Sequence, residues 1–122
     1  MLSFRRYFLA ATRKSENKKI GDSVRMYKEL CKRDAIEWTD HASKRMLERI
    51  ISRQDVKTAI MTGEVIEVYP DDQPYASCLI LGVNGLHVVI SVGDGKLWIV
   101  TAYRPSSDKW ESDLKTRKKV LT

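Results

Sequence analysis

The sequence predicts an α+β fold: a small sheet of four or five antiparallel strands, with N-terminal helices packed on one face and a short C-terminal helix. Two observations predict it. Apolar residues recur at helical spacing up to Gly63, and from Glu64 onward they alternate as in a strand. Asn84-Gly85 and the run 93–95 then divide the second half into hairpins. A chain of 122 residues has the length of one domain with one core.

The N-terminal segment, residues 1–22, is predicted to be poorly ordered or extended, and residues 23–119 to form the single domain. Residues 1–14 contain no acid and mix arginines with aromatics, as organellar transit peptides do. An over-extended start of a bacterial chain, with Met26 as an internal start, explains the segment equally well. No apolar run approaches the ~20 residues that a membrane helix needs, so no membrane partner is expected.

Three segments show helical apolar spacing behind a capping residue: 23–33, 39–49 and 52–63. Thr39 or Asp40 caps the second segment. The third opens with a Ser-x-x-acid signal and ends at Gly63. Residues 35–38 are either an edge strand or an extended lead-in.

Four segments are predicted strands: 64–69, 75–83, 86–92 and 96–103. In the first, Ile66 and Val68 are expected on one face, and the other face is expected to carry Val65, Glu67 and Tyr69. Pro105 ends the last strand, and acids at 108 and 111 predict a terminal helix that Trp110 anchors to the sheet. Trp98 is expected in the core.

The two central turns decide which way His87 points. If Asn84-Gly85 is a two-residue loop, His87 lies opposite Gly82 with an exposed imidazole. A two-residue loop at Asp94-Gly95 would put Tyr103 on the opposite face from His87, whereas a loop one residue longer would put both on the same face. The sequence leaves these two registers open.

Charge is unevenly distributed along the chain. Residues 1–53 carry 14 Lys and Arg against 7 Asp and Glu, whereas residues 54–103 carry 2 against 6. Basic helices beside an acidic middle fit a nucleic acid partner, and an acidic protein almost as well. Cys31 and Cys78 are far apart, so no disulfide framework is expected and a reducing, cytoplasmic compartment is favoured. The two histidines have no ligand spacing for a metal, and no cofactor motif is present.

The remaining residue types are those of metal-free ribonucleases: histidines for proton transfer, arginines for the phosphorane charge and tyrosines as donors. His41, Arg45 and Arg49 form one polar stripe on the second helix at successive i, i+4 positions. A solvated basic flank of an ordinary amphipathic helix is the alternative interpretation of that stripe.

Four stretches resemble, in unbroken order, the motifs of a small bacterial and archaeal family, the domain of unknown function 4258: 39–49, 63–82, 86–89 and 101–110. That family is similar to the RelE/BrnT-type toxin superfamily, whose members cut mRNA without metal. The resemblance implies RNA as a partner and a small zinc-finger protein as an antitoxin-like partner.

The function that this resemblance implies is a toxin-like, metal-independent endoribonuclease, and a noncatalytic RNA- or protein-binding module of the same fold is the alternative. The expected catalytic residues are His41, His87, Arg45 and Tyr103. The expected RNA- or phosphate-binding residues are Arg49, Tyr69 and Arg104. Relatives often carry an acid after the tyrosine of the last motif, so Arg104 departs from the pattern and its role stays open.

Overall fold

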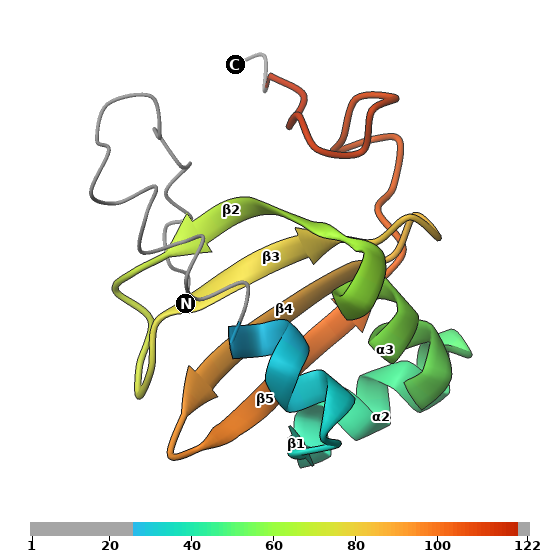
Figure 1. The fold of residues 1–122 in the computed structure, drawn as a ribbon. Coiled ribbons are helices and arrows are strands. Elements are labelled where there is room, and N and C mark those ends of the chain that lie inside the picture. Colours follow the sequence, from blue (N-terminus) through green and yellow to red (C-terminus); the bar gives the residue numbers. More distant parts are fainter. Residues whose placement is uncertain (1–25, 120–122) are drawn as a thin grey trace.

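The computed structural model describes residues 26–119, in which five strands form one mixed sheet with helices on one side (Figure 1). Residues 26–32 are helical, and the remaining elements follow in chain order: β1 (Ile36–Trp38), α2 (Asp40–Arg49), α3 (Arg53–Thr62), β2 (Glu64–Tyr69), β3 (Ser77–Leu81), β4 (His87–Gly93) and β5 (Lys96–Tyr103). The predicted N-terminal segment and the cap at Ser23 lie outside the described residues. No helix in the described range is long and apolar enough to cross a membrane.

Capping residues place the two central helices as predicted. The Thr39 hydroxyl accepts a hydrogen bond from the Ala42 N–H at 3.1 Å and donates one to Ile99 O at 2.9 Å, which fastens the start of α2 to β5. At α3, Ser52 and Asp55 form a reciprocal capping box. The helix ends at Gly63.

The sheet has the order β1-β5-β4-β3-β2. Consecutive strands from β2 to β5 pair antiparallel, so the predicted four-stranded meander is confirmed. Residues 36–38 are the predicted edge strand, but β1 pairs parallel to β5, and the sheet is therefore mixed rather than antiparallel. A long connection of two helices and three strands separates β1 from β5, which permits the parallel pairing that a tight hairpin would not.

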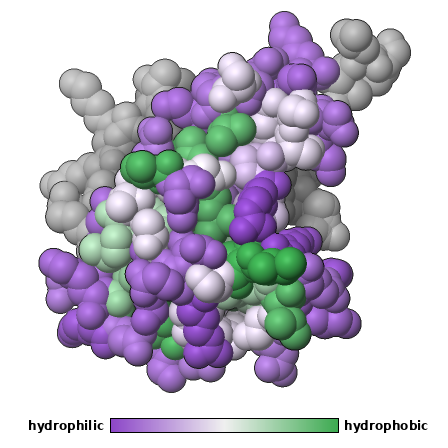
Figure 2. All heavy atoms as spheres, turned by 90° about the vertical axis from the view of Figure 1, so that its right-hand side faces the viewer, coloured by the Kyte–Doolittle hydropathy of each residue, from purple (hydrophilic) through white to green (hydrophobic). Residues whose placement is uncertain are grey.

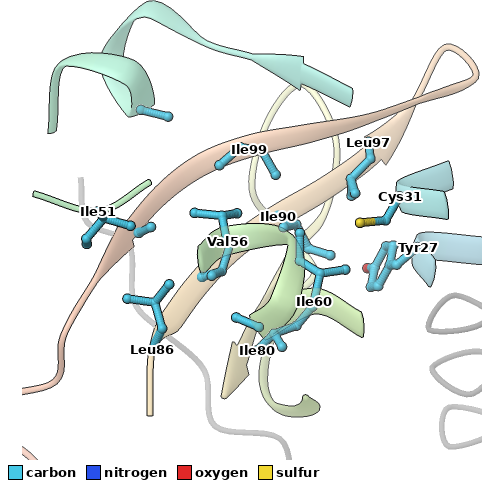
Figure 3. Packing of buried hydrophobic residues seen from close by; sticks show 14 of the residues in the cluster. Tyr27, Cys31, Ile51, Val56, Ile60, Ile80, Leu86, Ile90, Leu97 and Ile99 are labelled. Atoms are coloured by element: carbon cyan, nitrogen blue, oxygen red, sulfur yellow. The ribbon is translucent and has the colours of Figure 1, made fainter. Parts of the chain in front are cut away.

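The main core lies between the helices and one face of the sheet. In Figure 3, Val56 and Ile60 of α3 lie over the sheet near Ile80, Ile90 and Ile99. The helical residues before β1 contribute further apolar side chains to this cluster: Tyr27, Leu30 and Cys31. Removal of this apolar surface from water is the main force that holds the helices on the sheet.

The turn between β3 and β4 differs from the prediction by one residue. Leu81, not Gly82, pairs with His87, because the loop contains three residues, Val83 to Gly85. Gly85 N–H donates to Gly82 O at 2.9 Å and Gly85 has φ +80°, which is the arrangement of a three-residue hairpin with a left-handed glycine. The expectation that His87 stands beside a glycine is therefore wrong.

A bulge in β5 resolves the register that the sequence left open. Asp94-Gly95 is a two-residue loop, with Gly93 paired to Lys96 and positive φ at both loop residues. Further along, Val89 pairs with Thr101 and Ile90 with Ile99, so Val100 has no partner across the ladder. This extra residue places Tyr103 opposite His87 on the same face, although the loop is short.

A second bulge, at Ile66, breaks the alternation predicted for β2. Val65 and Val68 pack with the helix-side core, whereas Ile66 and Tyr69 pack on the other face. The predicted face assignment was therefore wrong for Ile66 and Val65, because strict alternation holds only in a regular ladder.

The predicted C-terminal helix is absent: residues 104–119 form turns and a single bridge between Trp110 and Arg117. We call residues 104–118 the C-terminal segment. Asp113 accepts hydrogen bonds from the backbone of residues 115 and 116, and Leu114 has φ 63°. These turn contacts outcompete helix formation. The anchoring role predicted for Trp110 is confirmed, because the ring is 3% exposed and packs with Tyr69, Leu79 and Val89.

Candidate functional site

The sheet face opposite the helices has two parts. The C-terminal segment covers one part, around Trp110 and His87. The other part lines a pocket of about 540 Å³, formed by Thr39, His41, Asp72, Gln73, Pro74, Tyr75, Ser77, Ser91, Asp94, Trp98 and Val100. The predicted site residues divide between these two parts and the end of α2.

Two aromatic rings form an apolar part of the pocket. Tyr75 and Trp98 have ring centroids 6.3 Å apart at 35°. The Trp98 indole N–H donates to Gly93 O at 2.8 Å, which fixes the ring. Gly93 has no side chain, and a Cβ there would lie 2.4 Å from the Tyr75 ring, so this glycine lets the tyrosine approach the backbone. Trp98 is thus half-buried at a pocket and not in the core as predicted.

Polar groups complete the pocket. The Ser77 hydroxyl donates to Asp72, and both Ser77 and Ser91 are buried. His41 is exposed and reaches the pocket from the first turn of α2. Asp94 lines the pocket from the β4–β5 turn. The pocket therefore combines aromatic faces with hydrogen-bond acceptors and one accessible imidazole.

The three arginines predicted as site residues, Arg45, Arg49 and Arg104, have separate roles. Arg45 is half-buried, and its guanidinium forms an ion pair with Glu48 at 3.0 Å. The Arg49 guanidinium donates to Ala102 O at 2.8 Å and so ties the end of α2 to β5. Arg104 donates to the carbonyls of Arg49 at 2.8 Å and Ile50 at 3.2 Å, as a cation at a helix C-terminus does. Of the three guanidiniums, only that of Arg45 makes no contact that fixes the fold.

His87 is 0% exposed, and both of its ring nitrogens are hydrogen-bonded. Leu114 O lies 2.7 Å from Nε2 and can only accept, so Nε2 carries the proton and Nδ1 accepts from the Tyr103 hydroxyl at 3.2 Å. Burial lowers the pKa of His87 below its usual value. A side chain without exposed surface cannot reach a phosphodiester, so in this conformation His87 is not available for proton transfer.

Tyr69 lies in the same covered part. Its hydroxyl donates to Glu67 at 2.6 Å, and Glu67, 2% exposed, receives a two-point contact from Arg117 at 2.7 and 2.9 Å. The Arg117 guanidinium also lies over the Trp110 ring, 4.5 Å from its centroid. Three of the expected site residues, His87, Tyr103 and Tyr69, thus lie together beneath the C-terminal segment, whereas His41 lies at the pocket.

Sequence reasoning missed several residues of both parts. Glu67 and Arg117 are fifty residues apart, and nothing local signals their contact. Asp72 falls between two predicted strands, and Tyr75 falls at the start of the strand predicted over 75–83, whereas β3 begins at Ser77 and Tyr75 lines the pocket. An acid within an apolar strand was the one available signal, because a buried carboxylate needs a partner. Among the residues that the structure describes, no group of three His, Cys, Asp or Glu side chains could hold a metal ion.

Comparison with known protein families identifies the family of this chain. The model of the domain of unknown function DUF4258 matches residues 38–104, more than half of the 122 residues. The chain belongs to this family. No curated protein and no solved structure matches it.

The DUF4258 match spans the pocket, His87 and Tyr103. It stops before Trp110 and Arg117, which cover His87 and Glu67, and it begins after Tyr27 and Leu30, which belong to the core. The family description names no activity. Likeness to RelE/BrnT-type toxins stays a prediction.

Proposed function

We propose that this chain binds single-stranded RNA, with one base in the pocket beside Tyr75 and Trp98. The observation that carries the proposal is the pocket itself, in which two half-buried aromatic rings lie next to an exposed histidine. Aromatic rings are the common platform for unstacked bases, because every base has a flat face to stack.

The charges of the pocket fit a base better than a phosphate. Asp72 and Asp94 line it, and carboxylates repel phosphate but accept hydrogen bonds from the amino groups of bases. We expect the phosphate of the bound nucleotide at the edge of the pocket, where His41 is followed one helical turn later by Arg45. The Arg45 ion pair with Glu48 is exposed on both sides, so it contributes little and can be exchanged for a phosphate contact.

Fluorescence anisotropy with a labelled, mixed-sequence single-stranded RNA in EDTA tests the proposal. Tyr75→Leu and Trp98→Leu should each weaken binding about tenfold or more, because stacking contributes ~1–3 kcal/mol per base. Trp38→Leu is the matched control, since Trp38 is half-buried and outside the pocket, under Arg53. Binding should also weaken with salt. Absence of binding at low salt, or equal binding by the pocket variants, would refute it.

A second candidate function is metal-independent cleavage of the bound RNA, as a toxin-like endoribonuclease would perform. His41 favours it, because it is exposed beside the proposed base and can exchange a proton with a ribose hydroxyl or a leaving oxygen. This second candidate function includes a small zinc-finger protein as an antitoxin-like partner, and the proposal of that partner is based on the family resemblance alone.

Incubation with RNA in EDTA separates the two candidates. If the chain cleaves, His41→Gln should abolish cleavage and keep most of the binding, whereas His87→Gln should keep both. Binding without cleavage would mean that the chain is a noncatalytic RNA-binding module. Cleavage that needs His87 and not His41 would overturn the assignment to the pocket, because the reaction would then occur beneath the C-terminal segment.

A further inference from the structure

An exposed apolar pair marks the other end of α2. Leu47 is 81% exposed and Ile50 is 84% exposed, three residues apart at the point where the helix ends. Figure 2 faces the side of the molecule that carries α2 and α3, and hydrophobic patches stand there among hydrophilic surface. Single exposed apolar residues are common, so exposure alone decides nothing.

The backbone at Ile50 supplies an independent observation. Ile50 has φ 56° and ψ 53°, the left-handed conformation that glycine usually provides at this position. For a β-branched residue this conformation is a genuine outlier, because its Cβ crowds the following carbonyl oxygen. The side chain recovers almost nothing by burial, because it is exposed. A glycine would close the helix more favourably, so the fold itself does not require isoleucine here.

Two arginines hold this strained end rigid. Arg104 binds the carbonyls of Arg49 and Ile50, and Arg49 binds Ala102 O. The backbone N–H of Ile50 also closes the helix onto Leu47 and Met46. Leu47 and Ile50 are therefore presented on a fixed backbone, which lowers the entropy lost on binding.

Cations surround the pair. Lys44 lies one turn before Leu47 on α2, and Arg49 and Arg104 donate to neutral carbonyls. The Asp55 carboxylate interacts with the charge of Arg104. Within the described part of the chain, the hydrogen bonds and ion pairs of Lys44 and Arg49 include no acid. A second copy of the chain would bring the same cations together and is disfavoured by repulsion. An acidic segment with apolar side chains matches both the charge and the two exposed side chains.

We propose that Leu47 and Ile50 form a docking site for an acidic, apolar segment of a partner protein. The site is distinct from the pocket, because His41 and the pocket lie at the opposite end of α2. Burial of the two side chains provides the affinity, and Lys44, Arg49 and Arg104 select the acidic partner.

Selection of short random peptides displayed on phage, with the full chain as target, tests the proposal. The recovered peptides should carry an excess of Asp and Glu together with apolar residues. Their affinity for Leu47→Ser and for Ile50→Gly should each fall about tenfold or more, because each variant lacks the aliphatic side chain that the bound peptide would bury. Ile50→Gly relieves the strain, so weaker binding by this variant would not reflect misfolding.

Val83→Ser is the control, because Val83 is 81% exposed on the β3–β4 turn and should leave the affinity unchanged. No recovered peptide, peptides without acidic excess, or equal binding to Ile50→Gly would overturn the proposal. Sedimentation that shows a dimer lost in Leu47→Ser would also overturn it, in favour of a second copy.

Discussion

At the scale of single residues, the two histidines of the described chain have opposite environments. His41 is exposed at a pocket, whereas His87 is enclosed by Tyr103, Trp110 and Leu114. The sequence correctly predicted that His41 lies on a helix and His87 on a strand, but it could not predict how exposed each side chain is. Two of the residues that cover His87, Trp110 and Leu114, come from the C-terminal segment, which begins seventeen positions after it and contains no helix or named strand.

The enclosure of His87 predicts a pH dependence of stability. Burial lowers its pKa below 6.5, so the unfolded chain takes up the proton first as pH falls. The free energy of unfolding should be full above about pH 6.5 and should decline below it, until the folded pKa is passed. Urea unfolding between about pH 7.5 and 5 should show this slope, and His87→Gln should flatten it.

His41→Gln is the control for this slope and should leave it unchanged. The lowered carboxyl pKa values of Asp55 and Asp113 affect stability only near or below about pH 4, outside this window. An unchanged slope in His87→Gln would mean that another group titrates.

Ile50 provides a prediction of increased stability. Ile50→Gly should raise the free energy of unfolding by about 1 kcal/mol, because glycine adopts the left-handed conformation without the Cβ penalty. Chemical denaturation measures the change. Leu47→Gly, on the same surface but inside the helix, should instead destabilise by about 1 kcal/mol. A loss of stability in Ile50→Gly would show that the exposed side chain contributes to the fold.

At the scale of elements, sequence patterns gave the helices and strands well, because caps and periodicity are local. The Ser52–Asp55 capping box and the bounds of β2 and β5 agree with prediction. The patterns failed where a bulge or a distant contact intervened. A bulge leaves no reliable local signal, and the C-terminal segment is shaped by contacts with Glu67 and His87 rather than by its own propensity.

The Glu67–Arg117 contact should be the strongest polar attachment of the C-terminal segment. Arg117→Met leaves the Glu67 carboxylate buried without its cation and should cost about 3 kcal/mol in urea unfolding. The matched control is Lys115→Met, which removes an exposed pair with Glu64 and should cost less than about 1 kcal/mol. Adding Glu67→Gln to Arg117→Met should recover part of the loss; equal costs for the two single variants would contradict this account.

At the scale of the whole molecule, the core extends beyond the part that the family match covers. Tyr27, Leu30 and Cys31 are at most 7% exposed, and they precede residue 38, where the match begins. The Cys78 thiol donates to the Tyr27 hydroxyl at 3.3 Å, and burial raises the pKa of Cys78 to about 12. This helix is thus part of the folded unit.

Leu30→Ala should therefore reduce the free energy of unfolding by about 3 kcal/mol, as a large-to-small change in a core does. Met26→Ala is the control on the same helix; Met26 is 53% exposed, and its loss should change stability by less than about 0.5 kcal/mol. Thermal or urea unfolding distinguishes them. A small effect of Leu30→Ala would place the boundary of the folded unit at the start of the family match.

The unpaired residue of β5 has a consequence for how this chain can change over generations. Val100 separates two registers, and past it Ala102 lies in the main core while Tyr103 lies against His87. Deletion of Val100 would reverse those two residues, forcing the tyrosine into the helix-side core and the alanine into the space under Trp110. Substitution of Val100 by another residue therefore keeps the register of β5. Deletion of its codon would shift that register, and we expect selection to remove such deletions. The length of β5 is thus more strongly constrained than its composition.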